Sequence, residues 1–166
     1  MTDIKIKRSL KLDREISLIL KRFKIQHKSG SAVGNITYSE FLTDPILMIT
    51  LIKEGIPYSL FSLIKDTTPL SETDWAIYLD ISTKSLQRYK ESSRRFKPMQ
   101  SEKIIEMAEV TSIGVDVFGK EERFRLWLET PNFALGRQKP KELLMDSYGK
   151  ELVISELIRI NHGILV

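Results

Sequence analysis

The sequence contains no cysteine, which excludes disulfide bonds and thiolate metal sites. It has only two histidines, His27 and His162, and neither stands in a metal-ligand spacing or beside the pattern of an activated nucleophile. It also lacks a Gly-rich phosphate loop. Neighbouring acids such as Glu121 and Glu122 diverge around a helix and do not form a carboxylate pair. We therefore expect no catalytic residue, no metal and no cofactor, and thus no enzyme.

Long apolar runs are missing as well, because no stretch approaches the roughly 18 residues of a membrane-spanning helix. The N-terminus interleaves charges with Ile and Leu and offers no cleavage site, so we expect no secretory signal. The 42% hydrophobic and 29% charged residues are typical of soluble proteins. With 166 residues, we expect one medium or two small domains in a cytoplasmic protein that has no membrane partner.

Positive charge is concentrated at the N-terminus. Residues 1–30 hold nine Lys or Arg and three Asp or Glu, a net charge of +6, whereas the remaining residues carry a net charge of −2. Such an arm favours a polyanion such as nucleic acid, although a solvated arm that only aids solubility has the same composition. Leu12, Ile16, Ile19 and Phe23 recur at helical spacing and predict a basic amphipathic helix. This helix is too short to be stable alone, so it must pack on the body or on a second copy.

Residues 26–40 are rich in Gly and Ser and have the composition of a linker, which places a domain boundary near residue 40. Asp44 and Pro45 predict the start of a helix that stops at Gly55. A second helix follows Pro57. Ser71 and Asp74 have the spacing of a capping box and predict a third start.

Residues 72–91 have the pattern of a helix-turn-helix. Its inward positions are apolar or small: Trp75, Ala76, Leu79, Ile81, Leu86 and Tyr89. Asp80 stands at the turn, where a residue that tolerates left-handed backbone geometry is needed. Ser82 is suited to cap the second helix.

On this interpretation the second helix and the segment after it present polar and basic side chains outward. They could contact phosphates and base edges in a major groove, and Lys90 and Lys97 extend the positive surface. The alternative is a charged face that is only solvated. The DNA-binding candidates are Thr83, Lys84, Ser85, Gln87, Arg88, Arg94 and Arg95.

The last third of the chain begins after a predicted long helix over residues 98–118. A helix over 120–129 places Phe124, Trp127 and Leu128 on one side. A helix over 149–161 has an apolar stripe of Val153, Leu157 and Ile160, and its polar residues fall opposite the stripe. We expect these two helices to clasp each other. The polar residues opposite are Lys150, Glu151, Glu156 and Arg159.

Gly163 is suited to stop the last helix, and three apolar residues, Ile164, Leu165 and Val166, follow it. An apolar chain end is expected to dock on something rather than stay in water.

Residues 118–163 resemble the toxin-binding domain of the Xre/MbcA/ParS antitoxin family. The resemblance implies a type II antitoxin whose partner is a RES-domain toxin that destroys NAD, and whose C-terminal segment reaches the cleft of that toxin. Arg137 stands where many members have a second Gly. The residues that carry the resemblance are Phe118-Gly119, Trp127-Leu128, Pro131-Asn132, Ala134-Leu135-Gly136, Pro140, Leu143-Leu144, Gly149, Val153, Leu157, Arg159-Ile160 and Gly163.

The family carries an Xre-like helix-turn-helix domain in front of this domain, which matches the pattern at residues 72–91. The predicted toxin-binding residues lie at the end of the last helix and in the tail. His162 is equally consistent with a helix-end residue near the negative end of the helix dipole, and burial within its own domain is favoured for Trp127. The toxin-binding candidates are Arg159, Asn161, His162, Gly163, Ile164, Leu165 and Val166.

The prediction is an all-α protein with a basic arm (1–40), an Xre-like helix-turn-helix domain (41–118) and a toxin-binding domain (119–166). We expect an antitoxin that blocks a RES-domain toxin and, as a homodimer, binds operator DNA at its own promoter. One alternative is a stand-alone transcriptional regulator whose C-terminal domain binds a small ligand or only dimerises. Another is an adaptor that does not bind DNA.

Overall fold

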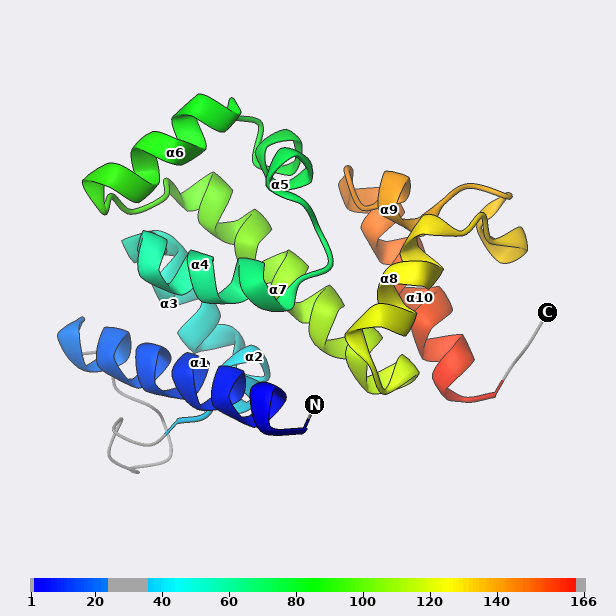
Figure 1. Ribbon diagram of the computed structural model, residues 1–166, viewed down its shortest axis with the longest axis horizontal. Coiled ribbons are helices and arrows are strands. Elements are labelled where there is room, and N and C mark those ends of the chain that lie inside the picture. Colours follow the sequence, from blue (N-terminus) through cyan, green and yellow to red (C-terminus); the bar gives the residue numbers. More distant parts are fainter. Residues whose placement is uncertain (1, 24–35, 164–166) are drawn as a thin grey trace.

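The computed structural model describes residues 2–23 and 36–163, and over these ranges the protein is all-α, as predicted (Figure 1). The elements in chain order are α1 (Thr2–Arg22), α2 (Tyr38–Leu42), α3 (Pro45–Glu54), α4 (Tyr58–Thr67), α5 (Glu72–Tyr78), α6 (Thr83–Ser92), α7 (Pro98–Phe118), α8 (Glu121–Glu129), the 3₁₀ turn η2 (Phe133–Leu135), α9 (Pro140–Leu143) and α10 (Ser147–Asn161).

Helix α7 is the central element, and its predicted bounds are confirmed. It packs on α2, α3 and α4 along one part of its length and on α8 and α10 along the other. Its buried face includes Ile104, Ala108 and Thr111. One hydrophobic core therefore runs through the molecule, from Phe61 in α4 to Leu157 in α10.

Helix α1 packs on the body, against α4 and α2. The amphipathic helix predicted around Leu12–Phe23 is confirmed, since Leu12, Ile16 and Ile19 are buried, but it starts earlier, at Thr2. The charged residues that precede Leu12 interrupt the apolar pattern, so the sequence did not indicate this start. The partner that the helix requires is the chain's own core.

Helix α2 begins inside the stretch of residues 26–40 that was predicted to be a linker and continues beyond it to Leu42. Thr37 and Glu40 form a capping box, in which the Thr37 amide donates to the Glu40 carboxylate at 2.8 Å. This T-x-x-E spacing is a recognisable start signal in the sequence, and it was missed. The predicted helix starts at Asp44 and at Ser71 are confirmed, because Asp44 accepts from two backbone amides and Ser71 forms its box with Asp74.

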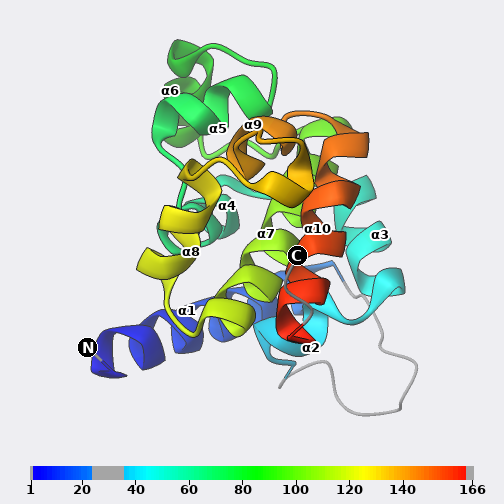
Figure 2. The same cartoon turned by 90° about the vertical axis from the view of Figure 1, so that its right-hand side faces the viewer.

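The prediction that α8 and α10 clasp each other is wrong, because both helices pack mainly on α7 and α9. Figure 2 shows the ribbon of α7 between those of α8 and α10. Glu156 was also placed wrongly, since only 8% of it is exposed and its carboxylate accepts from Arg159 at 3.2 Å. Because α10 packs against α7, α9 and η2, more of its circumference is covered than its apolar stripe indicates.

Among the described residues, no helix is both long and apolar enough to span a membrane. The same residues contain no cluster of three or more His, Asp or Glu side chains that could hold a metal ion.

Candidate functional site

Helices α5 and α6 are joined by the turn that the sequence predicts. Asp80 has a positive φ of 54°, and the amide of Ile81 donates to the Ala76 carbonyl at 3.0 Å. The hydroxyl of Ser82 then accepts from the Ser85 amide at 3.0 Å and starts α6. The turn thus fixes the direction of α6 relative to α5.

The inward positions of this motif are filled as expected. Trp75, Ala76, Leu79 and Leu86 are buried, and Ile81 and Tyr89 are partly buried against the core. The Trp75 ring meets the Phe61 ring edge-on, with the centroids 5.1 Å apart. This packing against α4 holds the motif on the body and leaves the opposite side of α6 to solvent.

The exposed face of α6 carries Thr83, Lys84, Gln87 and Arg88. Gln87 donates to Glu91 at 3.2 Å, so its amide is already oriented along the helix. Ser85 is half-buried, and its hydroxyl lies 2.9 Å from that of Ser82. Of the predicted candidates on α6, Ser85 is therefore the one whose side chain also serves the helix cap.

The segment after α6 brings in Arg94 and Arg95, which are both exposed. The Arg94 carbonyl accepts from the Tyr58 amide at 3.3 Å, which ties this segment to the start of α4. The Arg95 guanidinium lies 4.3 Å from the centre of the Phe23 ring and 3.7 Å from the Glu54 carboxylate. Arg95 thus joins α1, α3 and the segment that follows α6.

A second candidate surface lies on the outer face of α10. Tyr148, Leu152 and Ile158 are 84%, 55% and 47% exposed, although Val153 and Leu157 on the same helix are buried. These three residues were not among the predicted toxin-binding residues. The signal was present, because Tyr148 and Leu152 are four residues apart and fall on one side of the helix.

The predicted residues at the end of α10 are found where the helix stops. Arg159 is half-buried, whereas Asn161, His162 and Gly163 are exposed. Gly163 has a φ of 70°, which confirms its role as the helix stop. Ile164, Leu165 and Val166 lie outside the described residues.

A groove of about 410 Å³ lies beside the end of α10. Its walls come from the end of α7, from α8, from η2 and the segment that leads into it, and from α10 itself. Trp127 lines it and packs on Phe118, with ring centroids 5.5 Å apart, so this side chain serves both the core and the groove. The lining residues are Phe118, Trp127, Thr130, Pro131, Asn132, Phe133, Ala134, Glu156 and Ile160.

The turn between α8 and α9 is held by Asn132, whose side chain accepts from the Ala134 amide at 2.8 Å. Gly136 and Arg137 follow with φ values of 66° and 63°. Arg137 therefore takes the left-handed conformation that favours glycine, and its guanidinium lies 5.8 Å from the centre of the Phe133 ring. Phe133 is 70% exposed.

Two ion pairs link α9 and α10 to earlier elements of the chain. Lys141 of α9 lies 2.9 Å from Asp74 of α5, and Lys150 of α10 binds Glu106 of α7. Burial pushes the pKa of Asp74 upward, but hydrogen bonds from Lys141 and Ser71 outweigh it and lower the pKa below its ordinary value. Burial raises the pKa of Glu109, one turn along α7 from Glu106.

Comparison with known proteins finds two family matches, and each covers the residues of one candidate surface. Residues 47–109 match an antitoxin Xre-like helix-turn-helix domain, and residues 114–163 match the antitoxin Xre/MbcA/ParS C-terminal toxin-binding domain. The chain is 27% identical over 119 residues to "Antitoxin Xre" of Yersinia enterocolitica serotype O:8 / biotype 1B, covering 71% of this chain and 80% of that protein. It is 25% identical over 116 residues to "Antitoxin Xre" of Photorhabdus laumondii subsp. laumondii, covering 69% of this chain and 78% of that protein.

Proposed function

We propose that this chain, which belongs to the Xre/MbcA/ParS antitoxin family, neutralises a RES-domain toxin and represses the promoter of its own operon. The family has a helix-turn-helix domain and a toxin-binding domain, so a toxin and DNA are its two partners. The RES identity of the toxin comes from the resemblance to the family. The observation that carries the toxin half is the exposure of Tyr148, Leu152 and Ile158 on the outer face of α10, which internal packing leaves uncovered.

Neutralisation is steric in this proposal. The end of α10 and the tail from Arg159 to Val166 enter the mouth of the toxin's active-site cleft, while Leu152 and Ile158 pack on its rim. Burying such side chains is favourable by about 25 cal/mol per Å² of apolar surface removed from water. Blocking substrate access requires no chemistry from the antitoxin, in agreement with the lack of a catalytic motif in its sequence.

A truncation after Asn161 tests this half. The full chain and the truncated chain are each co-expressed with the cognate toxin, and growth and cellular NAD are measured. We expect the truncated chain to lose protection while it still binds promoter DNA, which shows that it is folded. Protection by the truncated chain would rule out the tail as the blocking segment.

The exposed face of α6 supports the DNA half. Lys84 and Arg88 are exposed on the helix that a helix-turn-helix inserts into the major groove. A single small module of this kind rarely binds a specific site tightly, so we propose a homodimer that reads an inverted repeat. Affinity should fall steeply with salt because phosphate contacts release counterions.

A gel shift with the promoter upstream of the chain's own gene tests this half. We expect the pair Lys84→Ala and Arg88→Ala to abolish the specific shift. The absence of any shift by the wild-type protein, even at low salt, would remove the DNA half of the proposal and leave the toxin half standing.

The alternative, a stand-alone regulator with a small ligand, has one observation in its favour. The groove beside Trp127 has a volume of about 410 Å³ and aromatic walls, which is the size of a small-molecule site. Purification from the native operon separates the two functions, because an antitoxin is recovered with its toxin and a stand-alone regulator is recovered without one.

A further inference from the structure

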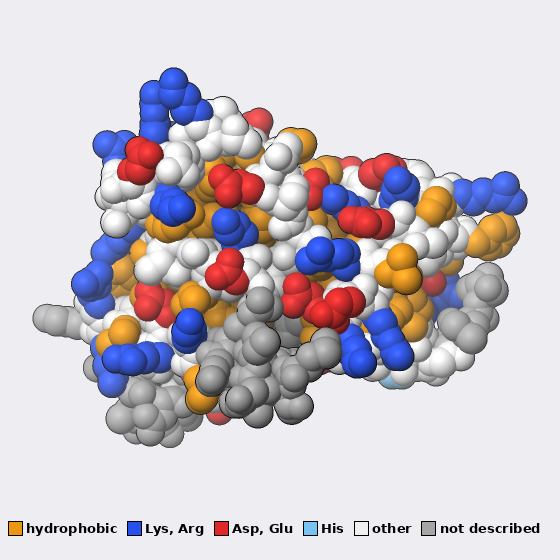
Figure 3. All heavy atoms as spheres, in the orientation of Figure 1, with side chains coloured by type: hydrophobic (Ala, Val, Ile, Leu, Met, Phe, Trp, Pro, Cys, Tyr) orange, Lys and Arg blue, Asp and Glu red, His pale blue; other side chains and the backbone are white. Residues whose placement is uncertain are grey.

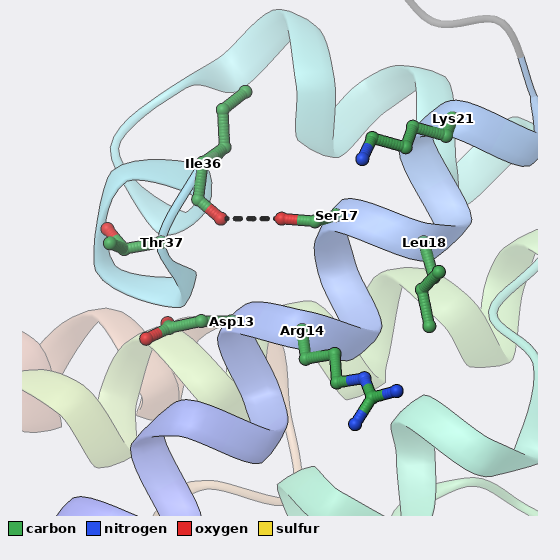
Figure 4. A pocket seen from close by; sticks show the side chains of 7 residues that line it. All are labelled: Asp13, Arg14, Ser17, Leu18, Lys21, Ile36 and Thr37. Carbon is green, nitrogen blue, oxygen red and sulfur yellow. Dashed lines mark hydrogen bonds between the residues drawn. The ribbon is translucent and has the colours of Figure 1, made fainter. Parts of the chain in front are cut away.

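The basic N-terminal helix is anchored at several points along its length. Asp13 accepts from the Tyr38 amide at 2.6 Å, and the Ser17 hydroxyl donates to the Ile36 carbonyl at 3.2 Å. Figure 4 shows Asp13, Ser17 and Ile36 around a hollow of about 330 Å³ between α1 and the segment that leads into α2. Together with the burial of Ile16 and Leu20, these bonds fix the orientation of α1. The backbone positions of its exposed cations are therefore fixed.

The last turn of α1 lies beside the segment that follows α6. Phe23 is the residue covered by the Arg95 guanidinium, at 4.3 Å from its ring centre. Lys21 and Arg22 immediately precede Phe23 and are exposed. They are thus within two residues of a direct contact with a predicted DNA-binding residue.

The charge around this contact is predominantly positive. Glu54 is an acid at the contact and pairs with Arg95 at 3.7 Å, while Lys53 beside it is exposed. Figure 3 shows Lys and Arg side chains along the edge of the molecule that runs from α6, at the top left, to the end of α1 below it. We call Lys21, Arg22, Lys53, Arg94 and Arg95 the α1 edge.

We propose that the last turn of α1 is a second DNA-contacting element, in which Lys21 and Arg22 bind backbone phosphates beside the groove that α6 enters. This inference rests on the proposed DNA-binding function. Phosphate contacts fix the register and orientation of a protein on the duplex and carry no sequence information of their own. Because α1 is fixed to the core, its cations meet the backbone without the ordering cost of a loose arm.

Nucleic acid is favoured over an acidic protein because the α1 edge is continuous with the exposed face of α6. Arg94 and Arg95 follow α6 directly and bring the two surfaces together. A duplex that occupies α6 therefore passes the α1 edge, and each phosphate neutralised there adds to the salt dependence of binding.

The test compares the double variant Lys21→Gln and Arg22→Gln with the wild type. Its matched control is Lys120→Gln and Arg123→Gln, two exposed cations around the start of α8. Fluorescence anisotropy measures binding to the promoter duplex and to an unrelated duplex of equal length, each over a salt series. Melting temperatures verify that all variants are folded.

We expect the α1 variant to lower the slope of log K against log salt by about two, since each phosphate contact contributes about 0.9. Its Kd should rise by the same factor on both duplexes, because phosphate contacts do not depend on sequence. The control should leave slope and Kd unchanged. In contrast, the α6 variant Lys84→Ala and Arg88→Ala should lose the preference for the promoter duplex.

An unchanged slope in the α1 variant, alongside impaired binding by the α6 variant, would overturn this inference and leave the proposed DNA-binding function intact. A loss confined to the promoter duplex would also overturn it, because that result indicates base readout. If the wild type binds neither duplex at low salt, the proposed DNA-binding function and this inference fail together.

Discussion

Gly114 lies inside α7, and its effect on stability is judged differently from the sequence than from the structure. Glycine inside a helix costs about 1 kcal/mol relative to alanine, so its presence weakens the prediction of α7. In the structure a Cβ at this position would lie 2.3 Å from a ring carbon of Phe124. Phe124 is fully buried and stacks on Phe118 and Trp127, so the ring cannot move aside freely. The glycine allows α8 to approach α7 closely.

We therefore expect Gly114→Ala to lower the free energy of unfolding by about 1–3 kcal/mol, because the overpacking cost exceeds the gain in helix propensity. Urea denaturation followed by circular dichroism measures this change. Ser155→Ala on the exposed side of α10 is the matched control, where propensity acts without new contacts and stability should stay the same or rise slightly. A Gly114→Ala protein as stable as the wild type would show that the close approach has room to relax.

At the scale of elements, Asp74 has two functions. It completes the capping box of α5, and it binds Lys141 of α9 at 2.9 Å. We expect Asp74→Ala to lower the free energy of unfolding at pH 7 by about 1–2 kcal/mol, since both a cap and a partly buried ion pair are lost. Asp66→Ala, at an exposed position in α4, should change it by less than about 0.5 kcal/mol.

The stability difference between the wild type and Asp74→Ala should depend on pH, because the pKa of Asp74 is lowered in the folded state. The ionised carboxylate stabilises the fold above its ordinary pKa of 3.8, and this stabilisation is lost as the pH falls through the lowered value. The difference between wild type and Asp74→Ala should therefore be constant from pH 7 to about pH 5 and shrink below the ordinary pKa. Denaturation midpoints measured from pH 7 to pH 3 give this curve, and a constant difference at all pH values would contradict the role of the charge.

The sequence predicted most elements because their signals are local. The cap at Asp44, the box at Ser71 and Asp74, the turn at Asp80 and the stop at Gly163 each act within a few residues. The missed box of Thr37 and Glu40 is local as well, but two other errors concern long-range packing: the burial of Glu156 and the placement of α7 against both α8 and α10 depend on neighbours far away in the chain. The spacing of Tyr148 and Leu152 places them on one side of α10, but their exposure, like that of Ile158, depends on which helices pack against α10.

At the scale of the whole molecule, the sequence predicts two helical domains after the arm, and in the structure α7 packs on elements of both halves within one continuous hydrophobic core. We therefore expect the chain to unfold in one cooperative transition. The two tryptophans permit a direct test, because Trp75 reports on the helix-turn-helix and Trp127 on the toxin-binding half. In the Trp127→Phe variant the fluorescence comes from Trp75 alone, and in the Trp75→Phe variant it comes from Trp127 alone.

In each single-tryptophan protein, the fluorescence midpoint in urea should equal the midpoint measured by far-ultraviolet circular dichroism, because coincident transitions are the signature of two-state unfolding. Adding Leu157→Ala, which removes a fully buried side chain of α10, should lower stability by about 2–5 kcal/mol. The Trp75 signal should shift as far as the Trp127 signal, although Leu157 lies in the other half. If Leu157→Ala moves only the Trp127 midpoint, α7 does not couple the halves, and the toxin-binding half unfolds independently of the helix-turn-helix.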